Sequence, residues 1–141
     1  MFRFILPCLL LAASMLFSGQ ASAKIVAHID ISQQRLYLYV NGAKRATWPV
    51  STARRGYRTP RGSYHPYWLN KNHRSSIYRG APMPYSVFFR GGYAIHGTNE
   101  VSRLGRPVSH GCIRLHPASA ATLFNLIRKH GYRNTRIRIT N

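Results

Sequence analysis

The sequence predicts a mainly β domain with one main helix, an α+β fold. Short stretches rich in aromatic and β-branched residues, bounded by turn residues, follow one another through most of the chain. An Asn-Gly pair at 41–42 separates two of these stretches, which is a strong signal for a β-hairpin. Only residues 117–131 combine helical spacing of apolar residues with helix start and stop signals.

The amino terminus has the three parts of a secretory signal peptide. Arg3 supplies a positive charge, residues 4–17 are apolar, and Ala-Ser-Ala at 21–23 is a small-residue cleavage site. Because about 20 apolar residues are needed to span a bilayer, we predict no transmembrane anchor in the mature chain. We expect residues 1–23 to be removed on export, and residues 24–141 to form one domain in the periplasm or cell envelope.

The first half of this domain is predicted to hold four strands. The Asn-Gly pair connects the second to the third, because a two-residue type I′ turn needs positive φ at both central residues. A turn at Thr-Pro-Arg-Gly, residues 59–62, precedes the fourth strand. The predicted strands cover residues 25–31, 35–40, 44–50 and 63–68.

The second half is predicted to begin with a long loop over residues 69–84, where polar residues, glycine and proline are frequent. Strands are expected at 85–89 and 93–95, around the Gly-Gly pair at 91–92. The helix starts at Pro117 and stops at Gly131, with three basic residues in its last turn. A strand over 135–140 closes the domain.

The charge of the chain is strongly positive. It has 21 Lys and Arg against two acidic residues, Asp30 and Glu100, which gives a net charge of +19. Such a charge attracts polyanions. Because export separates the protein from nucleic acid, we expect no nucleic-acid partner, and we expect anionic polymers of the envelope instead. The alternative explanation is that the charge serves solubility alone. A membrane-surface protein would need a long amphipathic basic helix, and the sequence contains none.

Cys112 is predicted to be a catalytic nucleophile. The other cysteine, Cys8, lies in the predicted signal peptide, so the mature chain has one thiol and no intrachain disulfide. A cysteine attacks as thiolate, and an ordinary pKa leaves only a few per cent ionised at neutral pH. We expect His96 to act as general base. We also expect the nearby positive charges of Arg103, Arg106 and Arg114 to lower the pKa of the Cys112 thiol.

The imidazole of His96 needs a group that fixes its tautomer. Asp30 is distant in sequence, and Glu100 lies in a predicted loop. We therefore expect a backbone carbonyl, that of Gly97 or Thr98, to hold the ring.

Residues beside the thiol are predicted to bind substrate. Gly111 has no Cβ, which allows the amides of Gly111 and Cys112 to point at a developing oxyanion. Arg114 can bind a substrate carboxylate. His110 either donates to the oxyanion or substrate or braces the loop, and Ser109 has the same two alternatives.

A zinc site is the alternative role for the histidines and the thiol, with His96, His110, Cys112 and His116 as ligands. The His110-x-Cys112 spacing is tight, and the chain contains no CxxC or HExxH pattern. We therefore predict no metal and no cofactor.

His-Gly-Thr at 96–98, followed by Ser-His-Gly-Cys-Ile-Arg at 109–114, resembles the active-site signature of the L,D-transpeptidase (YkuD-type) catalytic domain family. The resemblance covers essentially all of 24–141 and implies a YkuD-like mixed β-sandwich. Further segments that carry it are residues 30–36, 41–42, 59–62, 81–85 and 117–131.

This resemblance implies an enzyme of cell-wall biogenesis and cell shape. In the family, the cysteine attacks a diaminopimelate carbonyl of a peptidoglycan tetrapeptide stem and expels D-alanine. An amine then takes the acyl group, giving a 3→3 cross-link or lipoprotein attachment, and carbapenems acylate the same thiol. The implied roles are nucleophile for Cys112, base for His96, orienter for the Gly97 carbonyl, and substrate or oxyanion contacts for Thr98, Ser109, His110, Gly111 and Arg114.

Two departures from the family leave the acceptor open. The loop between His96 and Ser109 is shorter than in many members, and Arg114 replaces an asparagine found in part of the family. If water is the acceptor, the same thioacyl intermediate gives an L,D-carboxypeptidase or an amidase that cleaves cross-links or lipoprotein links. The alternative outside the enzymes is a non-catalytic module that binds the cell wall.

Overall fold

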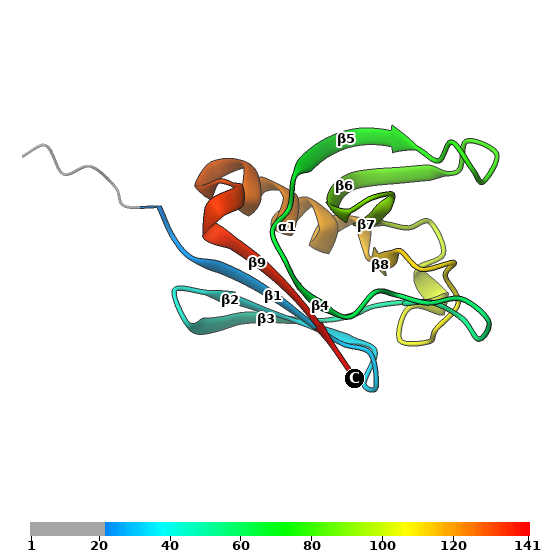
Figure 1. Cartoon of the computed structure of the whole chain (residues 1–141), viewed down its shortest axis with the longest axis horizontal. Helices are drawn as coiled ribbons and strands as arrows, with labels where there is room; N and C mark the ends of the chain where they lie inside the picture. Colours follow the sequence, from blue (N-terminus) through cyan, green and yellow to red (C-terminus); the bar gives the residue numbers. More distant parts are fainter. Residues whose placement is uncertain (1–21) are drawn as a thin grey trace, which may run out of the picture.

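The strands form two sheets with one long helix packed in the same core (Figure 1). The structure is a computed structural model and describes residues 22–141. The predicted signal peptide therefore lies almost entirely outside the described residues, and so does Cys8. Within 22–141, no helix is long and apolar enough to cross a membrane.

The first sheet has five strands in the order β3-β2-β1-β9-β4. Alternate side chains of β1, β2 and β9 are buried, which is the two-residue period expected when one face of a sheet packs on a core. The pairing of β1 with β9 is parallel, and all other pairs are antiparallel. The strands are β1 (Ile25–Asp30), β2 (Arg35–Val40), β3 (Ala43–Pro49), β4 (Gly62–Tyr64) and β9 (Thr135–Thr140).

The predicted hairpin between β2 and β3 is confirmed. Asn41 has φ 51° and Gly42 has φ 79°, so both central residues take the positive φ that a type I′ turn requires. This turn sets the antiparallel register of the two strands.

The second sheet has four strands in the order β5-β6-β7-β8. The three pairs along this order are antiparallel, antiparallel and parallel. Because β7 and β8 are parallel, a crossover must connect them, and this connection carries the 3-10 helix η1 (Val101–Arg103). The strands are β5 (Trp68–Arg74), β6 (Pro82–Arg90), β7 (Tyr93–Gly97) and β8 (Ile113–Leu115).

Two predictions about residues 63–84 are wrong. The strand predicted over 63–68 ends at Tyr64, and the loop predicted over 69–84 contains most of β5, a turn and the start of β6. β5 lies at the sheet edge and has only half-buried or exposed side chains. Such a strand has no apolar alternation, which is the signal that sequence analysis uses.

The helix α1 (Pro117–His130) begins and ends as predicted. Pro117 occupies its first turn, Nδ1 of His116 accepts a hydrogen bond from the Ala118 amide at 3.1 Å, and Gly131 ends the helix with φ 92°. The helix contacts β6 and β7, and the 3-10 helix η2 (Tyr132–Asn134) leads from it into β9.

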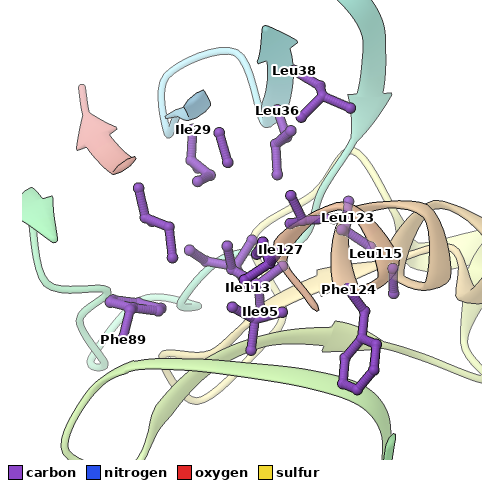
Figure 2. Packing of buried hydrophobic residues seen from close by; sticks show 14 of the residues in the cluster. Ile29, Leu36, Leu38, Phe89, Ile95, Ile113, Leu115, Leu123, Phe124 and Ile127 are labelled. Carbon is purple, nitrogen blue, oxygen red and sulfur yellow. The ribbon is translucent and has the colours of Figure 1, made fainter. Parts of the chain in front are cut away.

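A single large apolar cluster joins both sheets and the helix (Figure 2). Buried side chains from β1, β2 and β9 meet those from β6, β7, β8 and α1 in this cluster, and a smaller cluster of Met83, Phe88 and Ala94 lies within the second sheet. Burial of this kind contributes about 1.5–3 kcal/mol per large apolar side chain. Members of the cluster include Ile29, Leu36, Leu38, Phe89, Ile95, Ile113, Leu115, Leu123, Phe124, Ile127, Ile137 and Ile139.

Candidate active site

The parallel pairing of β7 and β8 brings the candidate site residues of two sequence segments together. His96 pairs in register with Arg114, and Cys112 lies two residues before Arg114 at the entry of β8. Residues two apart on a strand share a face, and residues paired in register do so as well. His96, Arg114 and Cys112 therefore share one face, while Ile95 and Ile113 point into the core.

This face opens into a cavity of about 550 Å³. The cavity lies between the second sheet, the turn that joins β5 to β6, and the loop that precedes β8. Gly97 and Gly111, which have no side chains, are the predicted site residues that do not line it. Those that do are His96, Thr98, Ser109, His110, Cys112 and Arg114.

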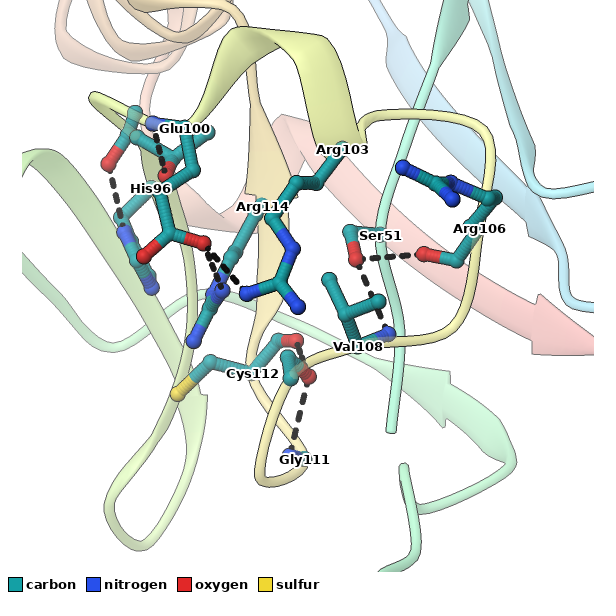
Figure 3. A network of polar contacts seen from close by, with 12 residues as sticks. Ser51, His96, Glu100, Arg103, Arg106, Val108, Gly111, Cys112 and Arg114 are labelled. Carbon is teal, nitrogen blue, oxygen red and sulfur yellow. Dashed lines mark hydrogen bonds and ion pairs between the residues drawn. The ribbon is translucent and has the colours of Figure 1, made fainter. Parts of the chain in front are cut away.

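His96 is a buried, neutral imidazole. Its Nδ1 lies 2.7 Å from the Gly97 carbonyl oxygen, which is the contact expected from the sequence (Figure 3). Burial lowers the pKa of His96 to about 4, and the charges of Arg114 and His73 act in the same direction. Because a carbonyl only accepts, Nδ1 carries the proton, and Nε2 is left with a free lone pair at neutral pH.

The surroundings of Cys112 favour its protonated thiol over the thiolate. Burial raises its pKa above the ordinary value, while the Ala94 backbone and the charge of Arg114 oppose this rise. The expected lowering of the thiol pKa is therefore wrong. Sγ donates to the Gly92 carbonyl oxygen at 3.8 Å, and within residues 22–141 no hydrogen bond joins it to His96. Base and nucleophile are thus two neutral groups in one cavity.

Ser109 braces the loop that carries the thiol. Its hydroxyl donates to the Cys112 carbonyl oxygen at 2.6 Å and accepts from the Gly111 amide at 3.0 Å (Figure 3). The Gly111 amide is therefore already engaged, contrary to its predicted role as an oxyanion donor. Of the two alternatives for Ser109, the geometry favours bracing.

Gly111 is required by its surroundings as well as by its backbone. Its φ is +136°, and a Cβ here would lie 2.7 Å from Cε1 of Tyr93 and 2.9 Å from the Arg58 carbonyl oxygen. The Thr59 hydroxyl donates to the Gly111 carbonyl oxygen at 2.8 Å. The turn at residues 58–61 therefore packs directly on the loop that holds Cys112.

Arg114 is shared between the cavity and a carboxylate. Oε2 of Glu100 lies 3.7 Å from Arg114 Nη1 and 2.9 Å from Arg103 Nη1 (Figure 3). The hydrogen bond from Arg103 holds the pKa of Glu100 below its usual range. Glu100 lies on the cavity wall and does not hold His96. Arg103 pairs with Glu100 locally, three residues away, whereas Arg114 reaches Glu100 from β8, and the sequence contained no signal for that contact.

His110 lies between two aromatic rings. The ring of Tyr78 stacks on it at 4.2 Å between centroids, and the ring of Tyr57 meets it edge-on at 4.8 Å. Desolvation, Arg54 and Arg114 lower its pKa. Sequence analysis missed both tyrosines, since each lies in a turn or loop, where an aromatic residue has no periodicity to mark it.

Within residues 22–141, no group of three His, Cys, Asp or Glu side chains is placed to hold a metal ion. The four candidate ligands considered from the sequence therefore do not form a coordination site among the described residues.

Comparison with known proteins relates the chain to enzymes of one kind. The family model described as the L,D-transpeptidase catalytic domain, YkuD, matches residues 24–139. The Bacillus subtilis protein that bears the name L,D-transpeptidase YkuD is 27% identical over 103 residues, which cover 70% of this chain and 58% of that protein.

Solved structures share the fold. An L,D-transpeptidase from Mycobacterium tuberculosis H37Rv superposes with a TM-score of 0.76 at 22% identity, covering 84% of this chain and 58% of that one. The LD transpeptidase LdtMt1, solved in complex with imipenem, superposes with a TM-score of 0.74 at 24% identity, covering 84% and 59%. The chain thus spans about three fifths of the length of these relatives.

Proposed function

The chain belongs to the L,D-transpeptidase catalytic domain family, and on that premise we propose that it is a peptidoglycan L,D-transpeptidase with Cys112 as nucleophile. The observation that carries the proposal is the parallel register of β7 and β8. It places a thiol, an imidazole with a free Nε2 and a guanidinium on one cavity face, and acyl transfer needs a nucleophile, a base and a carboxylate-binding group.

The first step is acylation of Cys112. Sγ attacks the diaminopimelate carbonyl carbon of a tetrapeptide stem while its proton passes to Nε2 of His96. The C–N bond to D-alanine then breaks, and the imidazolium returns the proton to the departing amine. The Gly97 carbonyl holds Nδ1–H throughout, which keeps Nε2 directed at the reaction.

Both partners are neutral before substrate binds, so proton transfer accompanies attack and no thiolate is stored in the free enzyme. Sγ must also leave the Gly92 carbonyl and turn towards His96. Such a turn is a rotation about the Cα–Cβ bond of Cys112 between staggered positions. Catalytic hydrogen bonds are often absent without substrate and form in the complex.

Charge that develops on the carbonyl oxygen needs a donor. With the Gly111 amide engaged by Ser109, we assign this role to the Cys112 amide, with the ring of His110 beside it. Arg114 binds a carboxylate of the stem and gives up part of its contact with Glu100 to do so. Thr98 closes the cavity wall and accepts a hydrogen bond from the Glu100 amide.

The second step transfers the acyl group to an amine of a second stem or of a lipoprotein. Water in place of the amine gives a carboxypeptidase or an amidase. We propose that the protein acts after export, in the periplasm or envelope, and that anionic envelope polymers are further partners of its positive charge.

Carbapenem sensitivity is part of the same proposal. The relative LdtMt1 has been solved with imipenem. We propose that imipenem acylates Cys112 of this chain, because its strained carbonyl presents the same electrophile to the thiol.

The test is to incubate the protein with a disaccharide-tetrapeptide and weigh the products. A dimer that has lost one alanine is expected. Loss of alanine without a dimer would identify a carboxypeptidase, and an unchanged substrate would reject the enzyme in favour of a binding module.

A further inference from the structure

A second hollow lies beside the catalytic cavity. It has a volume of about 410 Å³ and is lined by Arg58, Pro60, Arg61, Arg90 and Tyr93. Tyr93 also lines the catalytic cavity, so one aromatic side chain borders both hollows. We call the second hollow the arginine groove.

The arginine groove is positive and has no acidic partner within residues 22–141. All three of its arginines are exposed, and none forms an ion pair among the described residues, where both ion pairs involve Glu100. Arg61 donates to Oδ1 of Asn141, and Arg90 donates to the hydroxyl of Tyr64 at 3.3 Å. These neutral contacts leave the positive charges uncompensated.

The groove is built onto the loop that carries the nucleophile. The carbonyl oxygen of Arg58 would lie 2.9 Å from a Cβ at Gly111, and Thr59 hydrogen bonds to the Gly111 carbonyl at 2.8 Å. The backbone that carries Arg58 and Arg61 is therefore fixed next to the loop that carries Cys112.

We propose that the arginine groove binds free carboxylates of the acceptor stem peptide, an inference that rests on the proposed function. Transfer needs two substrates to reach one acyl carbon. The catalytic cavity already provides Arg114 for the donor, and the groove shares Tyr93 with it.

The chemistry of the groove fits this ligand. Guanidinium groups bind carboxylates through paired, charge-assisted hydrogen bonds, and stem peptides carry several free carboxylates. A phosphate polymer of the envelope offers similar oxyanions. The observations favour the stem peptide, because the charges line a small hollow next to the thiol, whereas a long polymer needs an extended surface.

The experiment uses a tripeptide stem, which lacks the terminal D-alanine and so accepts without donating. Its KM as acceptor is measured for the wild type and for the double variant Arg61→Gln/Arg90→Gln. The control is Arg45→Gln/Arg133→Gln, which removes the same charge at exposed positions outside the groove. Imipenem labelling counts the active sites in each preparation.

We expect the groove variant to raise the acceptor KM about tenfold. This is the change in affinity that the loss of one charge-assisted hydrogen bond produces. The control variant should match the wild type. Amidation of the tripeptide carboxylates should raise the wild-type KM to the same extent and have little further effect on the groove variant. Equal KM values in the groove and control variants would overturn the proposal.

Direct binding of the tripeptide by calorimetry separates this proposal from the proposed function, since it needs no turnover. If the protein does not turn over but the groove variant binds the tripeptide tenfold more weakly, only the proposed function fails. If the groove variant keeps tripeptide binding and loses binding of inorganic polyphosphate, the groove serves a polymer and the acceptor assignment is wrong.

Discussion

The two sheets share one core but differ in what they contribute. The five-stranded sheet buries alternate side chains on β1, β2 and β9, and its strands contribute no residue to the lining of the catalytic cavity. The four-stranded sheet places His96 and Arg114 on the face opposite its buried isoleucines. Stability is therefore spread over both sheets, whereas the chemistry is confined to one edge of the smaller sheet.

Replacing the nucleophile should separate these contributions most strongly. Cys112→Ala removes the thiol from a partly buried position beside the small apolar cluster of Met83, Phe88 and Ala94. We expect turnover to fall by at least about a thousandfold and the free energy of unfolding to change by less than about 1 kcal/mol. Product mass and urea unfolding measure the two effects. Retained turnover would show that another residue is the nucleophile.

The converse experiment is a cavity in the five-stranded sheet. Ile29 on β1 is fully buried, so Ile29→Ala should lower the free energy of unfolding by about 2–5 kcal/mol. The rate of imipenem labelling of folded protein should stay within about twofold. Thr47→Ala, an exposed change on β3, is the matched control and should cost less than about 0.5 kcal/mol. A loss of labelling in step with the loss of stability would show that the five-stranded sheet also determines the chemistry of the site.

The buried imidazole should couple stability to pH. His96 has a pKa of about 4 when folded and an ordinary value near 6.5 when unfolded. The unfolded chain therefore binds more protons between these values, and the stability from His96 is complete above pH 6.5 and lost as pH falls towards 4. This amounts to about 3 kcal/mol.

Urea unfolding of the wild type and of His96→Gln at pH 7 and pH 4 measures this coupling. The variant should lose about 3 kcal/mol less than the wild type over this interval. Equal losses in the two proteins would show that His96 is not held neutral by the fold.

Two glycines that both have positive φ give the smallest contrast. Gly42→Ala in the β2–β3 turn meets nothing within 4 Å, so it should cost about 1 kcal/mol for its positive φ alone. Gly111→Ala adds the clash with Tyr93 and the Arg58 carbonyl, for roughly 2–4 kcal/mol in total. It should also slow imipenem labelling, since the thiol loop must move. If the two variants lose the same free energy of unfolding and labelling is unchanged, the close packing around Gly111 does not constrain the site.

The sequence predicted the larger sheet better than the smaller one. Alternating apolar residues identify β1, β2 and β9, and the Asn-Gly turn identifies a hairpin. In the smaller sheet, β5 was not predicted, because its exposed position at the sheet edge removes the alternation of apolar and polar residues. The parallel register of β7 and β8 could not be derived either, since pairing between distant segments leaves no local pattern.

The site shows the same division between local and tertiary information. The contact of His96 with the Gly97 carbonyl was predictable because it joins neighbouring residues. The direction of the Cys112 pKa was not, because it depends on burial, and charges close in sequence suggested the opposite sign. The aromatic neighbours of His110 and the partner of Arg114 likewise come from distant segments.

The central claim is that Cys112 carries the acyl group between two substrates. The direct measurement is the intact mass of the protein, quenched in acid during turnover of the tetrapeptide stem, with the adduct mapped by proteolysis. We predict a mass increase equal to the stem without its terminal alanine, located on Cys112 and absent from Cys112→Ala. Turnover without any adduct on Cys112, or an adduct on another residue, would contradict the account.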